Sequence, residues 1–138
     1  HRYKVSARIL SCIIDSHIYT YGQASERHCH CGNIPALQDD SSYQVDGSTF
    51  RNYDTKSHGT VNIYDALRQS FNIPALKAWQ QTKESAGNDA PKKFASKVGL
   101  DYDGKIGPSE VLGGSSSEFS PTQLGPAFAA ITNAGPYI

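Results

Sequence analysis

The sequence predicts a mainly helical chain in which a few short extended segments precede four helices. The first observation is that apolar residues between positions 60 and 135 recur at helical spacing, with caps, prolines and glycines where helices should begin and end. The second is that residues 39–59 are polar and rich in turn residues, so that 43–45 and 49–50 could be short strands or extended loop. We expect little regular structure in that polar stretch.

The first two helices meet at a short polar joint. Thr60 or Asn62 can cap the first helix, and its inward face ends on a hydroxyl residue, Ser70. Pro74 then interrupts the helix and is well placed in the first turn of a second one, because proline lacks an N–H group that a first turn does not need. Residues 70–72 are therefore expected in a rigid connection from which short polar side chains can be aimed at a substrate.

Two further helices follow. The third begins at Asp89 or Pro91 and ends at Gly99, because glycine readily adopts the left-handed conformation that ends many helices. The fourth begins at residues 120–123, where Ser, Pro and Gln stand in the order of a capping box, and it closes at Gly135. The glycine-rich stretch between them is expected to be loop.

Length and charge exclude several classes of function. A chain of 138 residues is long enough for one hydrophobic core. Its 13 basic and 13 acidic residues give a formal charge of +0, which argues against nucleic acid as a partner. No apolar run is long enough to cross a bilayer, and the start of the chain has neither Met nor a signal-peptide pattern. We therefore expect a piece of a longer protein.

Composition divides the chain into an atypical segment, 1–37, and a more ordinary one, 38–138. All three cysteines and four of the five histidines lie before Gly32. Clustered Cys, His and Arg without a helical or strand period are typical of a shifted reading frame. We therefore expect residues 1–37 to be out of frame or disordered.

The same cluster supports one alternative function, a small non-enzymatic interaction module that uses zinc. Residues 28–31 read His-Cys-His-Cys, and thiolates and imidazoles are the ligands that zinc prefers. The four ligands are consecutive, however, and no second pair follows at zinc-finger spacing. A module built on residues 17–31 is therefore the weaker interpretation, and no cofactor or metal is predicted for the rest of the chain.

Ser70 and Asn72 are the candidate catalytic residues. A serine hydroxyl both donates and accepts hydrogen bonds, so it can pass a proton between neighbouring groups, and an asparagine amide can hold a carbonyl of a substrate. Without its context the Ser-Phe-Asn triplet is a weak signal, since both residues could simply cap helices.

The surrounding sequence resembles the transpeptidase domain of class A penicillin-binding proteins, in which an S-x-N element stands beside an S-x-x-K nucleophile and a K-T-G strand. Residues 59–75 read GTVNIYDALRQSFNIPA and are similar to the family's S-x-N block. The other matching stretches, in order and with sensible spacing, are residues 46–59, 98–100, 108–115 and 120–135. The resemblance runs from about residue 38 to residue 138, and it is strongest to the penicillin-binding protein 2 type of Gram-positive cocci.

This resemblance implies a mixed α/β fold of the serine β-lactamase and transpeptidase type, to which this chain supplies mainly the helical part and an incomplete sheet. It also implies a serine DD-transpeptidase that cross-links peptidoglycan. The implied partners are a D-Ala-D-Ala stem peptide and β-lactams, and the implied location is the outer face of the bacterial cytoplasmic membrane. The membrane anchor lies outside this chain.

The departures from the family pattern concern the nucleophile. No serine in the chain is followed three residues later by lysine, and no Lys-Thr-Gly or Lys-Ser-Gly occurs. The resemblance therefore implies a chain that is inactive by itself. Outside the motif, His58 is expected to be a solvated loop residue and Trp79 a core residue.

Overall fold

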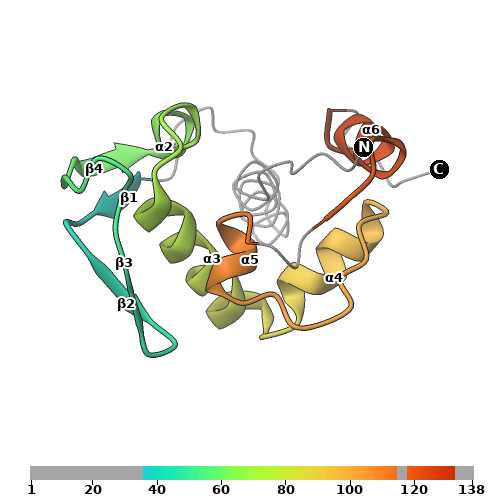
Figure 1. Cartoon of the computed structure of the whole chain (residues 1–138), viewed down its shortest axis with the longest axis horizontal. Helices are drawn as coiled ribbons and strands as arrows, with labels where there is room; N and C mark the ends of the chain where they lie inside the picture. The colour runs from blue at the N-terminus through green and yellow to red at the C-terminus, as the bar shows by residue number, and fades with distance from the viewer. Residues whose placement is uncertain (1–35, 115–117, 133–138) are drawn as a thin grey trace, which may run out of the picture.

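The computed structural model describes residues 36–114 and 118–132. The strands are β1 (Ala36–Asp39), β2 (Tyr43–Val45), β3 (Ser48–Phe50) and β4 (Gly59–Asn62). The helices are α2 (Ile63–Arg68), α3 (Asn72–Ala86), α4 (Ala90–Lys97), α5 (Pro108–Val111) and α6 (Pro121–Thr132). The strands and α2 lie on one side of the molecule and α4 and α6 on the other, with α3 and α5 between them (Figure 1).

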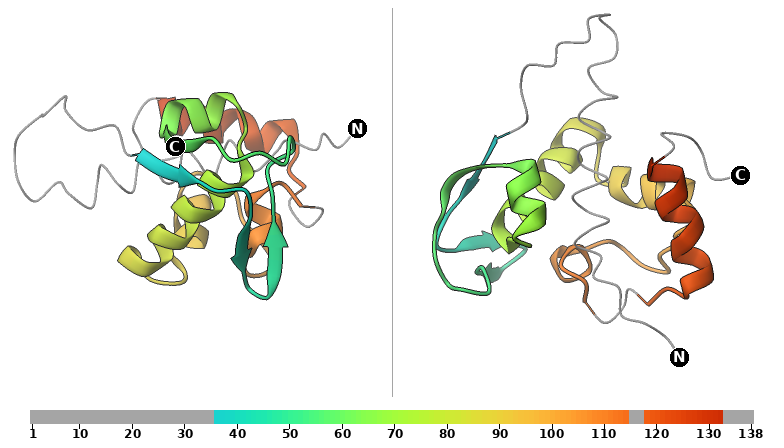
Figure 2. Two further views of the ribbon diagram at one scale, coloured as in Figure 1. Left: turned by 90° about the vertical axis from the view of Figure 1, so that its left-hand side faces the viewer. Right: turned by 90° about the horizontal axis from the view of Figure 1, so that it is seen from above.

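The polar stretch before α2 is more regular than the sequence indicates. β1 and β4 form an antiparallel pair in which Asp39 lies opposite Gly59. β2 and β3 form a second antiparallel pair, separate from the first in sheet order (Figure 2). Asp46 and Gly47 join β2 to β3 with φ values of 50° and 77°, the left-handed pair that a two-residue hairpin turn needs. The possible short strands at 43–45 and 49–50 are present as β2 and β3. The pairing of β1 with β4 was not expected, because it joins segments far apart in the sequence and leaves no local pattern.

The four predicted helices are present, with one addition, whereas the predicted end of the fourth at Gly135 lies outside the described residues. Asn62 caps α2, accepting a hydrogen bond from the backbone N–H of Asp65 at 2.8 Å. The second helix begins at Asn72, two residues before Pro74, which lies in its first turn as predicted. The third and fourth predicted helices are α4 and α6, and α5 is a short helix within the stretch that was expected to be loop.

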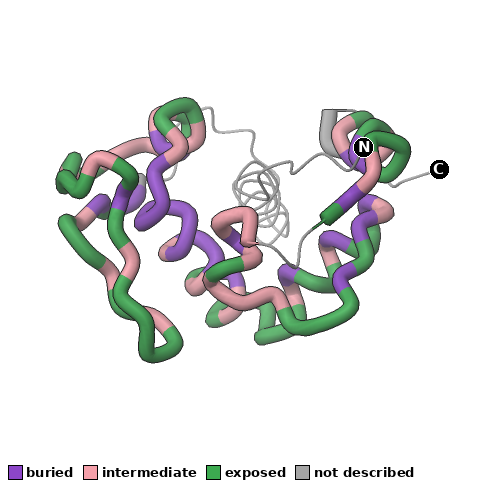
Figure 3. The backbone as a smooth tube through the Cα atoms, viewed as in Figure 1, coloured by how far each residue is buried: buried purple, intermediate pink, exposed green. Residues whose placement is uncertain are grey.

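The first half of α3 is the centre of the fold, buried along most of its length (Figure 3). It packs against β1, α2, α4 and α5. Leu76 is fully buried and Trp79 is 2% exposed, and both contact Val111 of α5. The prediction that Trp79 is a core residue is confirmed, and the helix that carries Asn72 is therefore held on several sides.

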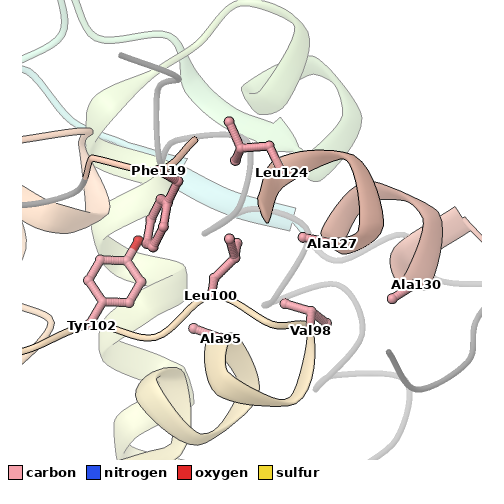
Figure 4. Close-up of a cluster of buried hydrophobic side chains, with 8 residues drawn as sticks. All are labelled: Ala95, Val98, Leu100, Tyr102, Phe119, Leu124, Ala127 and Ala130. Carbon is pink, nitrogen blue, oxygen red and sulfur yellow. The ribbon is translucent and has the colours of Figure 1, made fainter. Parts of the chain in front are cut away.

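A second core joins α4 to α6 (Figure 4). Its buried members are Ala95, Val98, Leu100, Tyr102, Phe119, Leu124, Ala127 and Ala130. The rings of Tyr102 and Phe119 meet edge to face, with centroids 5.1 Å apart, a geometry that aromatic pairs favour. This core fixes α6 against α4 and lies apart from the joint between α2 and α3.

Within the described ranges 36–114 and 118–132, no helix is long and apolar enough to cross a membrane.

Candidate functional site

Ser70 lies in a tight backbone turn directly after α2. Its φ is 57°, in the left-handed region that side chains rarely adopt. The Ser70 N–H donates to the carbonyl oxygen of Leu67 at 3.1 Å, and the Phe71 N–H donates to that of Ala66 at 3.0 Å. These two bonds form a Schellman motif, which ends a helix and reverses the chain. Ser70 itself is half-buried.

The same motif ends two other helices, and in both the left-handed position is glycine. Gly99 follows α4 with φ 80°, and Gly113 follows α5 with φ 85°. A side chain in this conformation costs about 1–2 kcal/mol, and glycine avoids that cost. Ser70 therefore stands at a position where glycine would be conformationally preferred. Strain of this kind is concentrated at functional sites.

Asn72, the other member of the S-x-N triplet, is the first residue of α3 and is 9% exposed. Its Nδ2 donates to the carbonyl oxygen of Arg51 at 2.7 Å. This contact fixes the orientation of the amide, because the opposite orientation would set two acceptors against each other. Its buried Oδ1 has no hydrogen-bond partner among the residues that the structure describes. The second N–H of Nδ2 and this oxygen are therefore the groups that the side chain can offer to a ligand or to another part of a complete site.

The start of α3 is capped from a distant loop. The residue before the helix is Phe71, whose side chain offers no cap, so the first backbone N–H groups need another acceptor. Asn52 supplies it: its Oδ1 accepts from the N–H of Asn72 at 2.9 Å and from that of Ile73 at 3.3 Å. Asn52 is only 2% exposed.

Asn52 is itself held by a buried carboxylate. Its Nδ2 donates to both oxygens of Asp39, each at 2.8 Å, and to the carbonyl oxygen of Lys56 at 3.1 Å. Asp39 is fully buried at the end of β1. A buried carboxylate is tolerated when its oxygens are hydrogen-bonded, and such a satisfied network favours a single arrangement of its members.

His58 completes this network: it is an exposed loop residue, as expected, but its side chain also has partners that the sequence did not indicate. Its Nδ1 lies 2.5 Å from Asp39 Oδ2, and its Nε2 lies 3.0 Å from Asp54 Oδ2. Its ring stacks on that of Phe71, with centroids 4.0 Å apart and planes at 19°. The His58 side chain is 28% exposed. It thus holds the middle residue of the Ser-Phe-Asn triplet.

The sequence predicted a role for Ser70 and Asn72 but did not indicate the three residues that hold Phe71 and the start of α3, which are Asp39, Asn52 and His58. Each of the three lies in polar, turn-rich sequence, and nothing local distinguishes it. One signal was available: a helix that starts after phenylalanine lacks a capping side chain of its own and must be capped from elsewhere.

The His-Cys cluster of the alternative function lies outside the described residues, as does the whole of the segment 1–35. Among the residues that the structure does describe, no three His, Cys, Asp or Glu side chains are grouped in a way that could hold a metal ion. The comparisons below give the zinc module no support either.

The chain is similar in sequence to penicillin-binding proteins. It is 35% identical over 103 residues to penicillin-binding protein 1A/1B of Bacillus subtilis (strain 168), a match that covers 72% of this chain and 11% of that protein. It is 31% identical over 109 residues to penicillin-binding protein 1A of Streptococcus oralis, which covers 71% of this chain and 16% of that protein. No family model matches the chain. Its relatives are thus penicillin-binding proteins, of which it spans only a small part.

The fold agrees. Penicillin-binding protein A from M. tuberculosis, solved as a ceftriaxone acyl-enzyme complex, superposes with a TM-score of 0.68 at 17% identity. The match covers 97% of this chain and 32% of that one. The imipenem acyl-enzyme complex of the same protein gives 0.67 at 16% identity. The expected transpeptidase-type fold is confirmed, and the described residues supply a mixed helical and stranded portion of it with few strands.

Proposed function

We propose that residues 38–138 are part of the penicillin-binding domain of a peptidoglycan DD-transpeptidase, and that Ser70 and Asn72 are its S-x-N element. The observation that carries the proposal is the joint between α2 and α3. There a serine occupies a strained left-handed turn, and two residues later a buried asparagine has an amide that the fold orients but does not fully use. The similarity to penicillin-binding proteins along the same stretch supports it.

In this proposal Ser70 takes part in proton transfer. A nucleophilic serine elsewhere in the complete domain attacks the penultimate D-alanine carbonyl of a stem peptide and releases the terminal D-alanine. Its hydroxyl is a poor nucleophile until a base takes its proton. Ser70 can donate and accept at once, so it can pass a proton toward the leaving amine. An amine of a neighbouring peptidoglycan strand then takes the acyl group, whereas a β-lactam stays attached to the serine as an acyl-enzyme.

Asn72 positions the substrate. One N–H of its amide is bonded to Arg51, and the other can donate to the acyl-chain carbonyl of a stem peptide or a penicillin. An unsatisfied buried acceptor such as its Oδ1 costs about 1–3 kcal/mol. The lysine of an S-x-x-K element, which the family places beside S-x-N, can donate to that oxygen. A complete site therefore gives a role to both ends of the Asn72 amide.

The proposal also covers the class of the parent enzyme and its place in the cell. The parent is a class A enzyme of the penicillin-binding protein 2 type, anchored in the bacterial cytoplasmic membrane with this domain on the outer face. Residues 1–37 stand where the S-x-x-K helix should be, and their reading frame stays a prediction that the nucleotide sequence upstream of residue 38 would test.

The test is acylation of the full-length protein by a labelled penicillin. Ser70→Ala should slow acylation by about 10²–10⁴-fold, the usual contribution of a positioned proton-transfer group. Asn72→Ala should slow it as well, because the substrate loses a positioning donor.

Ser85→Ala, the same change near the far end of α3, is the matched control and should leave the rate unchanged. Rates within about threefold of wild type for both Ser70→Ala and Asn72→Ala would contradict the proposal, because this is far below the expected contribution. The two residues would then be helix caps only.

A further inference from the structure

The loop that precedes α2 holds the Ser-Phe-Asn triplet at more than one point. Arg51 accepts from the side chain of Asn72, and Asn52 accepts from its backbone N–H. The His58 ring stacks on Phe71. Arg51 and Asn52 lie 21 and 20 residues before Asn72, His58 lies 13 before Phe71, and nothing in the proposed chemistry uses these residues directly.

Asn52 is the residue through which these contacts are joined. Both oxygens of the Asp39 carboxylate are acceptors, so the Asn52 NH₂ group must face them and its Oδ1 must face α3. That oxygen then meets the first two N–H groups of the helix. Because Asp39 and Asn52 are almost completely buried, water cannot easily replace either partner.

We propose that Asn52, oriented by Asp39, is a positioning residue for Asn72: it sets the start of α3 and so the direction of the free N–H of the Asn72 amide. The inference rests on the proposed function, since it assigns Asn72 a substrate carbonyl to hold. Arg51 and Asn52 are neighbours in the chain, and together they fix both the main chain and the side chain of Asn72. Without Asn52, the N–H groups of Asn72 and Ile73 lose their acceptor. The start of α3 can then shift, and the orientation of the Asn72 amide shifts with it.

The test compares two β-lactams that differ in the carbonyl that Asn72 holds. Benzylpenicillin carries an acylamide carbonyl, whereas aminopenicillanic acid has the same ring system and lacks that carbonyl. Second-order acylation rate constants are measured for both compounds on the full-length protein. The ratio used is the rate constant for benzylpenicillin divided by that for aminopenicillanic acid. In Asn52→Ala this ratio should fall by about tenfold, which is the scale expected for one misplaced hydrogen bond. A variant that is merely less folded would lose both rates equally and keep the ratio.

If Asn52→Ala does not fold, two further variants test the same contact by exchanging the amide and the carboxylate of residues 52 and 39. Asn52→Asp sets two buried carboxylates against each other and should lower the ratio or unfold the protein. The double variant Asp39→Asn with Asn52→Asp exchanges donor and acceptor, so that residue 52 again offers an oxygen to the N–H groups of Asn72 and Ile73. It should bring the ratio part of the way back toward the wild-type value, because the carbonyl oxygen of Lys56 loses the donor that Asn52 provides.

Asn62→Ala is the matched control, because it removes the cap of α2 without touching Asn72. It should leave the ratio unchanged. A wild-type ratio in Asn52→Ala, or a double variant that folds and keeps the low ratio of Asn52→Asp, would overturn the inference alone. A wild-type protein that neither compound acylates would overturn the proposed function, and the inference with it.

Discussion

Ser70 occupies a backbone position that two other helices in the same chain give to glycine. Gly99 and Gly113 end α4 and α5 with the same pattern of hydrogen bonds. The comparison is internal to one molecule, so differences in fold or conditions do not affect it. Position 70 therefore carries a side chain in a backbone conformation that glycine would adopt more easily.

This strain can be measured. Ser70→Gly and Ser70→Ala both remove the hydroxyl, so they differ only in the backbone preference of the new residue. We expect Ser70→Gly to exceed Ser70→Ala in free energy of unfolding by about 0.5–1 kcal/mol, because relief of the left-handed strain outweighs the extra chain entropy of glycine. Denaturant unfolding of this chain measures the difference.

The control is the reverse substitution at the equivalent position of α4. Gly99→Ala introduces the same strain there and should destabilise the protein by a similar amount, about 0.5–1 kcal/mol. An alanine variant at position 70 that is as stable as the glycine variant would show that the turn is not strained.

At the scale of single elements, the hairpin of β2 and β3 and the helix α6 each carry a glycine with open space around it. An added Cβ would meet nothing within 4 Å at Gly47 or at Gly125. Gly47 has φ 77°, whereas Gly125 lies inside a right-handed helix. The same substitution should therefore have opposite effects at the two positions, for conformational reasons alone.

We expect Gly125→Ala to raise the free energy of unfolding by less than about 0.5 kcal/mol, because the smaller loss of chain entropy with alanine is partly offset by contact of its Cβ with the ring of Pro126. Gly47→Ala should lower it by about 1–2 kcal/mol, because the hairpin turn needs a left-handed residue there. Thermal unfolding of the two variants beside wild type tests both signs. A stabilising Gly47→Ala would contradict the turn geometry.

At the scale of the whole molecule, the Ser-Phe-Asn joint is accompanied in this sequence by neither of the other two motifs of the proposed site. The sequence contains no Ser-x-x-Lys and no Lys-Thr-Gly. Proton relay and substrate positioning do not accelerate acylation when no activated serine is present to attack.

We therefore expect the 138-residue chain to form no covalent adduct with a fluorescent penicillin. Gel electrophoresis under denaturing conditions would show this, with a full-length penicillin-binding protein as the positive control. A labelled band that survives denaturation and maps to a serine of this chain would show that it contains a working nucleophile.

The sequence by itself determined the four longer helices, but not α5, and the joint that carries Ser70 and Asn72. Those features depend on contacts a few residues apart: Asn62 caps α2, Pro74 stands in the first turn of α3, and Gly99 ends α4. Helical periods, caps and breakers are local, so they can be read from a single sequence. The resemblance to penicillin-binding proteins then assigned the joint to a fold type that structural comparison confirms.

Only the tertiary structure decided what holds the joint in place. Asn52 meets Asp39 across 13 residues and Asn72 across 20, and His58 meets Asp39 across 19. In sequence these residues are ordinary members of a polar loop, and their pairing exists only after β1 and β4 have aligned and α3 has packed beside them. Side-chain hydrogen bonds over such separations follow no local period, because they depend on where the packed elements bring the chain.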